Sequence, residues 1–305
     1  MPEHQHVHDH THDHAPATFG RAFAIGVALN AALVALQFAY GLVSNSMALI
    51  ADAGHNLTDV LGLLMAWGAT AVSKWPPTGR YTYGLRSSSI LAALGNAIVL
   101  LVAVGAIAWE AGQRFVNPQP VLERTVMAVA AVAIVVNGGT ALLFSAGRKG
   151  DVNIRGAFMH MLTDAAISFG VLVSGLAILL TGWLWLDPLV SLAISVIIVW
   201  GTWGLLRDAM NLALNAVPAG INVNNVRAYL EGLPGVESIH DLHIWAMSTT
   251  ETALTCHLVM PAGQDGDAFL FEVAKRLQER FAIHHATLQI ERGDEQCALK
   301  PEHVV

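Results

Sequence analysis

Six apolar stretches, each long enough to cross a lipid bilayer as a helix, fill most of the first two thirds of the sequence. A helix needs about 20 apolar residues to span a hydrocarbon core of about 30 Å. The stretches run approximately over residues 19–43, 47–72, 86–112, 121–146, 154–181 and 184–207. Only 13% of all residues are charged, against about a quarter in soluble domains. We therefore expect an all-α membrane domain of six helices.

The distribution of Lys and Arg predicts which connections face the cytoplasm, where basic loops are enriched. Only Arg114 and Arg124 lie on one side of the expected membrane domain. Eight basic residues lie on the other side: Arg21, Lys74, Arg80, Arg86, Arg148, Lys149, Arg155 and Arg207. This bias predicts that both termini are cytoplasmic.

After Pro218 the sequence becomes more polar and predicts a small cytoplasmic α+β domain. Segments 223–233 and 267–281 are amphipathic and predict helices, whereas three β-rich segments predict strands, at 236–247, 252–260 and 287–291. The order αββαβ is typical of a small open sheet with helices on one face. We place the domain boundaries at 1–18 (tail), 19–208 (membrane domain), 209–292 (α+β domain) and 293–305 (tail).

The N-terminal tail is rich in histidine and too poor in apolar residues to form a core, so we expect it to be disordered. Histidine occupies every second position from His4 to His14. Six imidazoles can gather divalent metal weakly, although a tail without function is the alternative. The net charge of −7 includes no basic run, which argues against nucleic-acid binding. Cys256 and Cys297 are expected to be free thiols.

A five-residue pattern, His-x-Leu-Thr-Asp, occurs twice inside the apolar stretches, at residues 55–59 and 160–164. Residues i and i+4 share one face of a helix, with Cβ atoms about 5–6 Å apart. His55 and Asp59 therefore lie together, and so do His160 and Asp164. Asp52 lies one turn before His55 and is a further ligand, part of the access path or a local cap.

Two facing helices with this pattern bring two imidazoles and two carboxylates to one point. Such an N₂O₂ set suits tetrahedral Zn²⁺, and the two carboxylates neutralise the charge of the ion. Without a cation, one ionised Asp near the bilayer centre costs on the order of 3 kcal/mol. A lone intramembrane histidine is often only a hydrogen-bond partner between helices, but the duplication favours a shared metal site.

The two motif helices are expected to be antiparallel, because the second stretch runs toward the cytoplasm and the fifth runs away from it. An inverted arrangement around a midplane site is a common plan for alternating access. Histidine must lose its proton to bind a metal, so Zn²⁺ and H⁺ compete for the same atoms. This competition predicts Zn²⁺/H⁺ antiport.

At these residues the sequence resembles the cation diffusion facilitator family, specifically its zinc-transporting members. The longest matching stretch is S-N-S-M-A-L-I-A-D-A-G-H-N-L-T-D at residues 44–59. H-M-L-T-D at 160–164 and H-D-L-H-I-W at 240–245 follow in the expected order. The resemblance covers nearly the whole chain.

The resemblance implies a homodimeric zinc efflux carrier with a cytoplasmic metallochaperone-like domain and a transport site formed by His55, Asp59, His160 and Asp164. Members with Asp in place of the first His often accept cadmium, so His55 implies narrower selectivity. The resemblance also implies zinc ligands in the cytoplasmic domain. The matching positions are His243, His257, His284 and Glu291, with His240 and His285 as alternatives.

The sequence departs from the family pattern in three places. The loop after the second helix, W-P-P-T-G-R-Y-T-Y-G, contains no histidine, so no zinc site is expected there. The histidine-rich loop that many eukaryotic members carry between helices 4 and 5 is missing, and the N-terminal tail is a candidate substitute. A cysteine pair near the C terminus of some relatives is reduced here to Cys297.

Other readings remain open at this point. An efflux carrier for cadmium, cobalt or nickel is the alternative within the same class, because these ligands do not select one metal. An intramembrane zinc protease would need a Glu beside a motif histidine, and neither motif has one, so no enzyme is expected. A metal sensor would leave the intramembrane ligands unexplained. The short loops favour a bacterial inner membrane.

Overall fold

The computed structural model describes residues 21–73, 75–145, 152–263 and 267–293, together with residues 297 and 299. For Asp59 and some other residues within these ranges, the side chain is not described. The expected N-terminal tail and most of the expected C-terminal tail lie outside the described residues.

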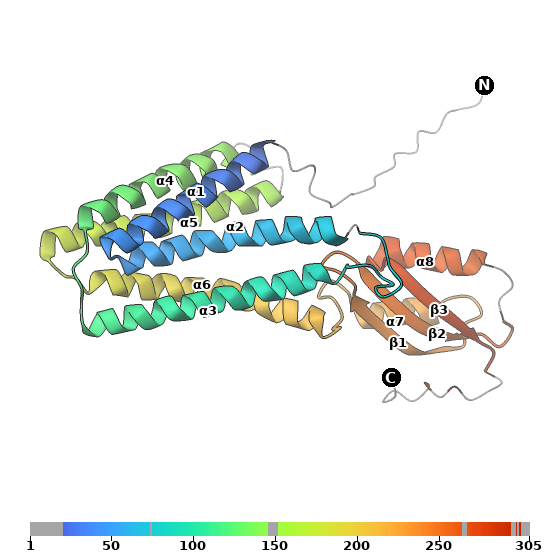
Figure 1. Cartoon of the computed structure of the whole chain (residues 1–305). Helices are drawn as coiled ribbons and strands as arrows, with labels where there is room; N and C mark the ends of the chain where they lie inside the picture. The colour runs from blue at the N-terminus through green and yellow to red at the C-terminus, as the bar shows by residue number, and fades with distance from the viewer. Residues whose placement is uncertain are drawn as a thin grey trace, which may run out of the picture.

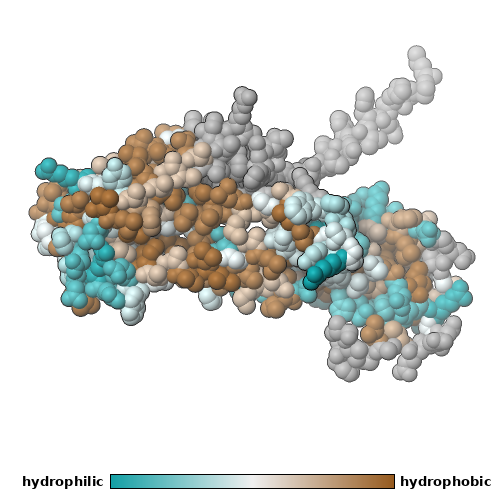
Figure 2. Space-filling view, in the orientation of Figure 1, coloured by the Kyte–Doolittle hydropathy of each residue, from teal (hydrophilic) through white to brown (hydrophobic). Residues whose placement is uncertain are grey.

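Six long helices form the N-terminal part of the molecule (Figure 1). They are α1 (Arg21–Ser44), α2 (Met47–Ser73), α3 (Ser88–Val116), α4 (Glu123–Ser145), α5 (Val152–Thr181) and α6 (Leu186–Ala213). Helices α3 to α6 each contain a stretch that is long and apolar enough to cross a membrane, and α1 contains a shorter apolar helix, Ala28–Ser44. Figure 2 shows hydrophobic residues over the middle of this helical part. This is the surface that a bilayer requires.

The sixth helix is longer than the sequence analysis expected. It continues past Arg207 to Ala213, because no proline or glycine interrupts the chain before Pro218. It also begins two residues later than expected, at Leu186, after Gly182 has turned the chain at the end of α5 in the left-handed region at φ 70°. A residue without Cβ adopts this conformation without strain.

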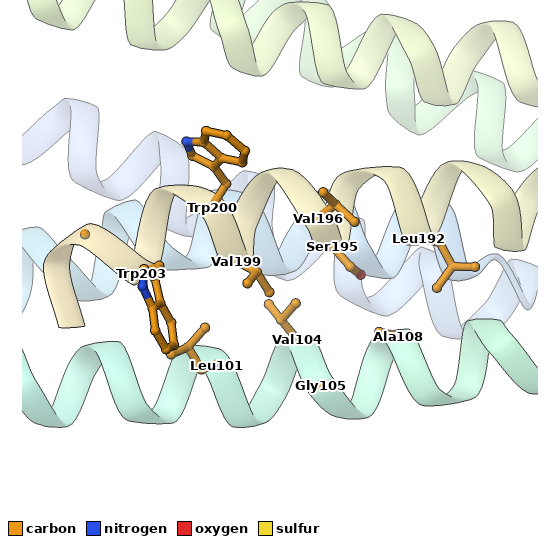
Figure 3. A pocket seen from close by; sticks show the side chains of 11 residues that line it. Leu101, Val104, Gly105, Ala108, Leu192, Ser195, Val196, Val199, Trp200 and Trp203 are labelled. Carbon is orange, nitrogen blue, oxygen red and sulfur yellow. The ribbon is translucent and has the colours of Figure 1, made fainter. Parts of the chain in front are cut away.

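Helix α4 packs closely against α5, and α3 packs closely against α6. Helices α3 and α6 lie side by side along one edge of the bundle (Figure 1). An apolar groove of about 740 Å³ runs between α3 and α6. In Figure 3, Trp203 of α6 points toward Leu101 of α3, whereas Trp200 points away from it. The lining is almost wholly apolar, which fits a surface in contact with hydrocarbon chains.

The C-terminal domain contains α7 (Val223–Glu231), β1 (Ser238–Ala246), β2 (Thr252–Val259), α8 (Ala268–Phe281) and β3 (His285–Glu291). The expected order αββαβ is confirmed. The sheet order is β1-β2-β3, with β2 antiparallel to β1 and parallel to β3. Both helices cover one face, because a single buried core contains side chains of β2, α7 and α8: Leu254, Cys256, Leu258, Val226, Leu230, Val273 and Leu277.

The C-terminal domain contacts the helical part at the start of α3. Arg86 pairs with Glu251 in the turn between β1 and β2. Ser87 Oγ donates to the carbonyl of Met247 (3.2 Å), and the amide of Thr249 donates to Ser89 Oγ (3.1 Å). The loop between α2 and α3 therefore lies on the same side as the C-terminal domain. We call the opposite end of the bundle the outer end.

A buried carboxylate on α6 caps the N-terminus of α2 at the outer end. Ser46 Oγ and the amide of Met47 both donate to Asp187, the amide at 2.6 Å. A carboxylate at this position satisfies free amides and complements the positive end of the helix dipole. Nearby, Arg114 of α3 donates to the carbonyl and the side-chain oxygen of Asn45 (2.9 and 2.7 Å). The outer ends of α2, α3 and α6 are thereby tied together.

We predict that Asp187→Asn destabilises the protein, because the charge-assisted hydrogen bonds to the start of α2 are lost. The expected loss is about 1–3 kcal/mol, seen as a lower midpoint of thermal unfolding in detergent. Asp208→Asn is the matched control, since Asp208 is an exposed acid of the same helix. Equal midpoints for both variants and the wild type would contradict this role of Asp187.

Candidate metal centres

Helices α2 and α5 bring three of the four motif side chains together in the middle of the bundle. His55 Nε2 lies 3.1 Å from Asp164 Oδ1, and His160 Nε2 lies 3.7 Å from Asp164 Oδ2. The two imidazole rings are 6.5 Å apart between centroids. Asp59 lies on α2 one turn after His55, but its side chain is outside the described residues. The carboxylate of Asp164 thus stands between imidazoles of two helices.

The three side chains differ in their exposure to solvent. Asp164 is 2% exposed and His55 is 14% exposed, whereas His160 is 41% exposed. A buried carboxylate needs a compensating partner, and the two imidazoles stand where a divalent cation could bind all three groups. Imidazole nitrogen and carboxylate oxygen are common ligands of zinc.

The expectation that Asp52 is a ligand or lines the access path is refined by its contacts. Asp52 is fully buried, and its Oδ2 accepts hydrogen bonds from Gln37 Nε2 (2.6 Å) and Ser168 Oγ (2.8 Å). Gln37 Oε1 in turn accepts from Asn56 Nδ2 (2.9 Å). Gln37 and Ser168 were missed from sequence. Their only signal is that each is a polar residue within an apolar helix.

A second cluster lies on the face of the C-terminal sheet that the helices leave uncovered. His240, His257, Glu291 and Cys297 offer ligand atoms that all lie within 4.8 Å of one another. His257 Nδ1 is 2.9 Å from Glu291 Oε1, and His240 Nε2 is 3.3 Å from Glu291 Oε2. Cys297 Sγ is 3.7 Å from His257 Nδ1. Two imidazoles, a carboxylate and a thiol form a donor set typical of zinc.

Two of the expected ligands in this domain are not part of the cluster. His243 contacts Asp241 instead, with Nε2 at 2.8 Å from Oδ1. His284 Nδ1 accepts a hydrogen bond from the amide of Thr252 at 3.3 Å. The alternative His285 packs its ring edge-on against Tyr83. Of the expected positions, His257 and Glu291 are brought together, and the alternative His240 joins them.

A β-bulge explains why His240 and not His243 joins the cluster. The pairing of β1 with β2 shifts between His240 and His243, where Asp241 is left-handed at φ 52°. His240 pairs directly with His257. The bulge also turns Asp241 Oδ2 to 3.5 Å from His257 Nε2. A carboxylate on the second nitrogen of a ligating imidazole fixes its orientation.

The charge of Glu291 fits a role as a ligand. Partial burial acts to raise the pKa of this carboxyl, but a hydrogen bond from Cys297 and the charges of His240 and His257 hold the pKa below its usual value. The carboxylate is therefore ionised at neutral pH, as metal binding requires. By contrast, burial raises the pKa of the Cys256 thiol to about 12, so Cys256 is an inert core residue.

Both parts of the chain match models of known protein families. Residues 23–212 match the family model of the cation efflux transmembrane domain, and residues 218–293 match that of the cytoplasmic domain of cation efflux proteins. The C-terminal domain is therefore the cytoplasmic one. The loop between α2 and α3, which contacts it, is cytoplasmic too.

Curated relatives align over most of their length. Zinc transporter ZitB of Escherichia coli is 35% identical over 271 residues, which cover 88% of this chain and 86% of that protein. The metal cation efflux system protein CzcD of Cupriavidus metallidurans is 32% identical over 272 residues, 89% and 86% of the two chains. The cadmium, cobalt and zinc/H(+)-K(+) antiporter of Bacillus subtilis is 31% identical over 256 residues, 82% of each.

The matched residues include both His-x-Leu-Thr-Asp motifs of the helical domain, and the sheet domain with His240, His257 and Glu291. The chain is a multi-pass membrane protein and a cation efflux transporter, not an enzyme. It belongs to the cation diffusion facilitator family.

Proposed function

We propose that this protein exports Zn²⁺ from the cytoplasm in exchange for H⁺, by alternating access of a site formed by His55, Asp59, His160 and Asp164. The observation that carries the proposal is the buried Asp164 carboxylate, which lies between imidazoles of two different helices. Asp59 completes the set by its position one turn from His55 on α2. The names of the relatives support zinc as the cargo.

The ligand set supplies the chemistry of binding and release. Two neutral imidazoles and two carboxylates replace the water of hydration and cancel the charge of the ion, so the loaded site is neutral within the membrane. Protons compete with the metal for the same nitrogen and oxygen atoms. Because histidine titrates near pH 6.5, protons from a more acidic outer side displace Zn²⁺ there and return with the site.

Other divalent cations are the alternative cargo of this carrier. One relative is named for cadmium, cobalt and zinc, and nitrogen and oxygen ligands follow the general affinity order rather than one metal. A competition assay in which cadmium or cobalt suppresses zinc flux at equal concentration would favour this broader carrier.

We further propose that the cytoplasmic cluster binds a regulatory Zn²⁺ through His240, His257, Glu291 and Cys297. The proximity of their ligand atoms supports this assignment, and it replaces His243 and His284 as expected from sequence. The matching family domain is named for dimers, which supports a homodimer whose cytoplasmic domains respond to metal. The relatives from bacteria support location in a bacterial inner membrane.

For the transport site, we predict that Asp164→Asn lowers zinc flux into proteoliposomes under a pH gradient by at least about 100-fold. Loss of a partner behind a ligand already weakens metal binding by about 10–100-fold, and Asp164 is proposed as a ligand itself. Asp208→Asn, an exposed acid on α6, should leave flux unchanged. Near-normal flux in Asp164→Asn would rule out this transport site.

For the cytoplasmic cluster, we predict that zinc slows alkylation of Cys297 by a thiol reagent and that a chelator restores the rate. His240→Ala should abolish the protection, whereas His243→Ala, on the same strand, should retain it. Mass spectrometry of the two cysteine peptides measures both rates, and Cys256 should stay unmodified because its thiol is buried. An alkylation rate of Cys297 that zinc does not change would contradict the proposed ligand set.

A further inference from the structure

Four buried polar side chains lie next to the candidate transport site. Gln37 of α1, Asp52 and Asn56 of α2, and Ser168 of α5 are each at most 2% exposed. Asp52 Oδ2 accepts from both Gln37 and Ser168, and Gln37 accepts from Asn56. We call these four residues the outer polar cluster. Through Asp52 it joins α1, α2 and α5.

Two members of the cluster, Asp52 and Ser168, stand between the proposed metal ligands and the outer surface. α5 starts at the cytoplasmic side, so Ser168 lies one turn outward from Asp164. α2 runs the other way, so Asp52 lies one turn outward from His55. Inward of Asp164, the side chain of His160 is 41% exposed, whereas Asp52 and Ser168 are fully buried. The side chains one turn outward from the site are thus fully buried, whereas His160 on its cytoplasmic side is partly exposed.

The contact between α2 and α5 is small. α2 touches α5 far less than it touches α1 or α3, and the bond from Ser168 Oγ to Asp52 crosses between α2 and α5. In a medium of low dielectric a hydrogen bond to a carboxyl group is stronger than in water. The other carboxylate oxygen, Asp52 Oδ1, has no hydrogen-bond partner among the described residues.

We propose that the Asp52–Ser168 hydrogen bond, held in place by Gln37, is the outer gate of the transport path. This inference rests on the proposed function. The bond keeps α2 and α5 together on the outer side while the cation binds from the cytoplasm. It must break before the cation can leave outward.

The polar nature of this contact suits a reversible gate. Opening an apolar seal exposes apolar surface to water, which is unfavourable in proportion to the area. Opening the Asp52–Ser168 contact instead lets water hydrate a carboxylate and a hydroxyl, which replaces most of the lost hydrogen bond. The closed and open states can therefore be close in free energy, as alternating access requires.

A gate makes a prediction that a weakened metal ligand does not. Removing the bond with Ser168→Ala should favour the outward-open state by about tenfold, equivalent to about 1.4 kcal/mol. Apparent affinity scales with the populated fraction of the competent state. If the inward-open state dominates in the wild type, the half-saturating zinc concentration should fall about tenfold on the outer side. On the cytoplasmic side it should rise less than about twofold.

The test is radioactive zinc uptake into right-side-out and inside-out membrane vesicles that contain the full chain. Ser168→Thr keeps the hydroxyl and should behave as the wild type. Ser174→Ala is the matched control, because Ser174 is also buried on α5 but its Oγ has no hydrogen-bond partner among the described residues. Gln37→Met, which removes the donor from α1, should shift the outer affinity in the same direction as Ser168→Ala.

The outcomes separate the gate from the proposed function. An outer half-saturation that is unchanged in both Ser168→Ala and Gln37→Met, while the wild type carries zinc, would overturn the gate alone. A loss of affinity on both sides together would also overturn it, since that result indicates damage to the metal site. No zinc flux in the wild type would overturn the gate and the proposed function together.

Discussion

The structure depends on how buried carboxylates are compensated in an apolar bundle. Asp52, Asp164 and Asp187 are all buried within the helical domain, where an uncompensated charge is strongly unfavourable. Each has a different partner. Asp187 accepts amides at the start of α2, Asp52 accepts side-chain hydrogen bonds from two helices, and Asp164 faces two imidazoles. Of the three, only Asp164 is arranged so that ligand atoms of two facing helices point at one another. A bound cation would compensate this carboxylate best.

This difference separates the roles of the three acids along the axis of the bundle. Asp187 ties α6 to α2 at the outer end and supports the scaffold. Asp52 and Ser168 join α2 to α5 one turn outward from the proposed metal ligands. At the other end, Arg86 and Ser89 join the start of α3 to the turn between β1 and β2. The strands that carry His240 and His257 thus continue into a direct contact with the membrane domain.

The helical domain and the proximity of His55, His160 and Asp164 were predictable because their signals are local and repeated. Long apolar stretches predicted six helices within a few residues, and the spacing of His and Asp at i and i+4 predicted that His55 and Asp164 would meet.

The cytoplasmic cluster was only half predictable. Its geometry depends on the bulge at Asp241, which shifts the alternation of β1 and decides between His240 and His243. Nothing in the sequence pattern marks that bulge. Gln37 and Ser168 carry no motif, and their role follows only from the packing of α1 and α5 against α2.

X-ray absorption at the zinc edge tests the central claim most directly. The protein would be residues 19–305 with His240→Ala and His257→Ala, so that neither the histidine-rich tail nor the cytoplasmic cluster contributes zinc and the membrane site alone is measured. The account predicts one zinc per chain with only nitrogen and oxygen ligands at about 2.0–2.1 Å, a clear imidazole signal, and loss of this zinc in Asp164→Asn. Sulfur scattering at about 2.3 Å, or zinc that Asp164→Asn does not displace, would contradict the assignment of the transport site.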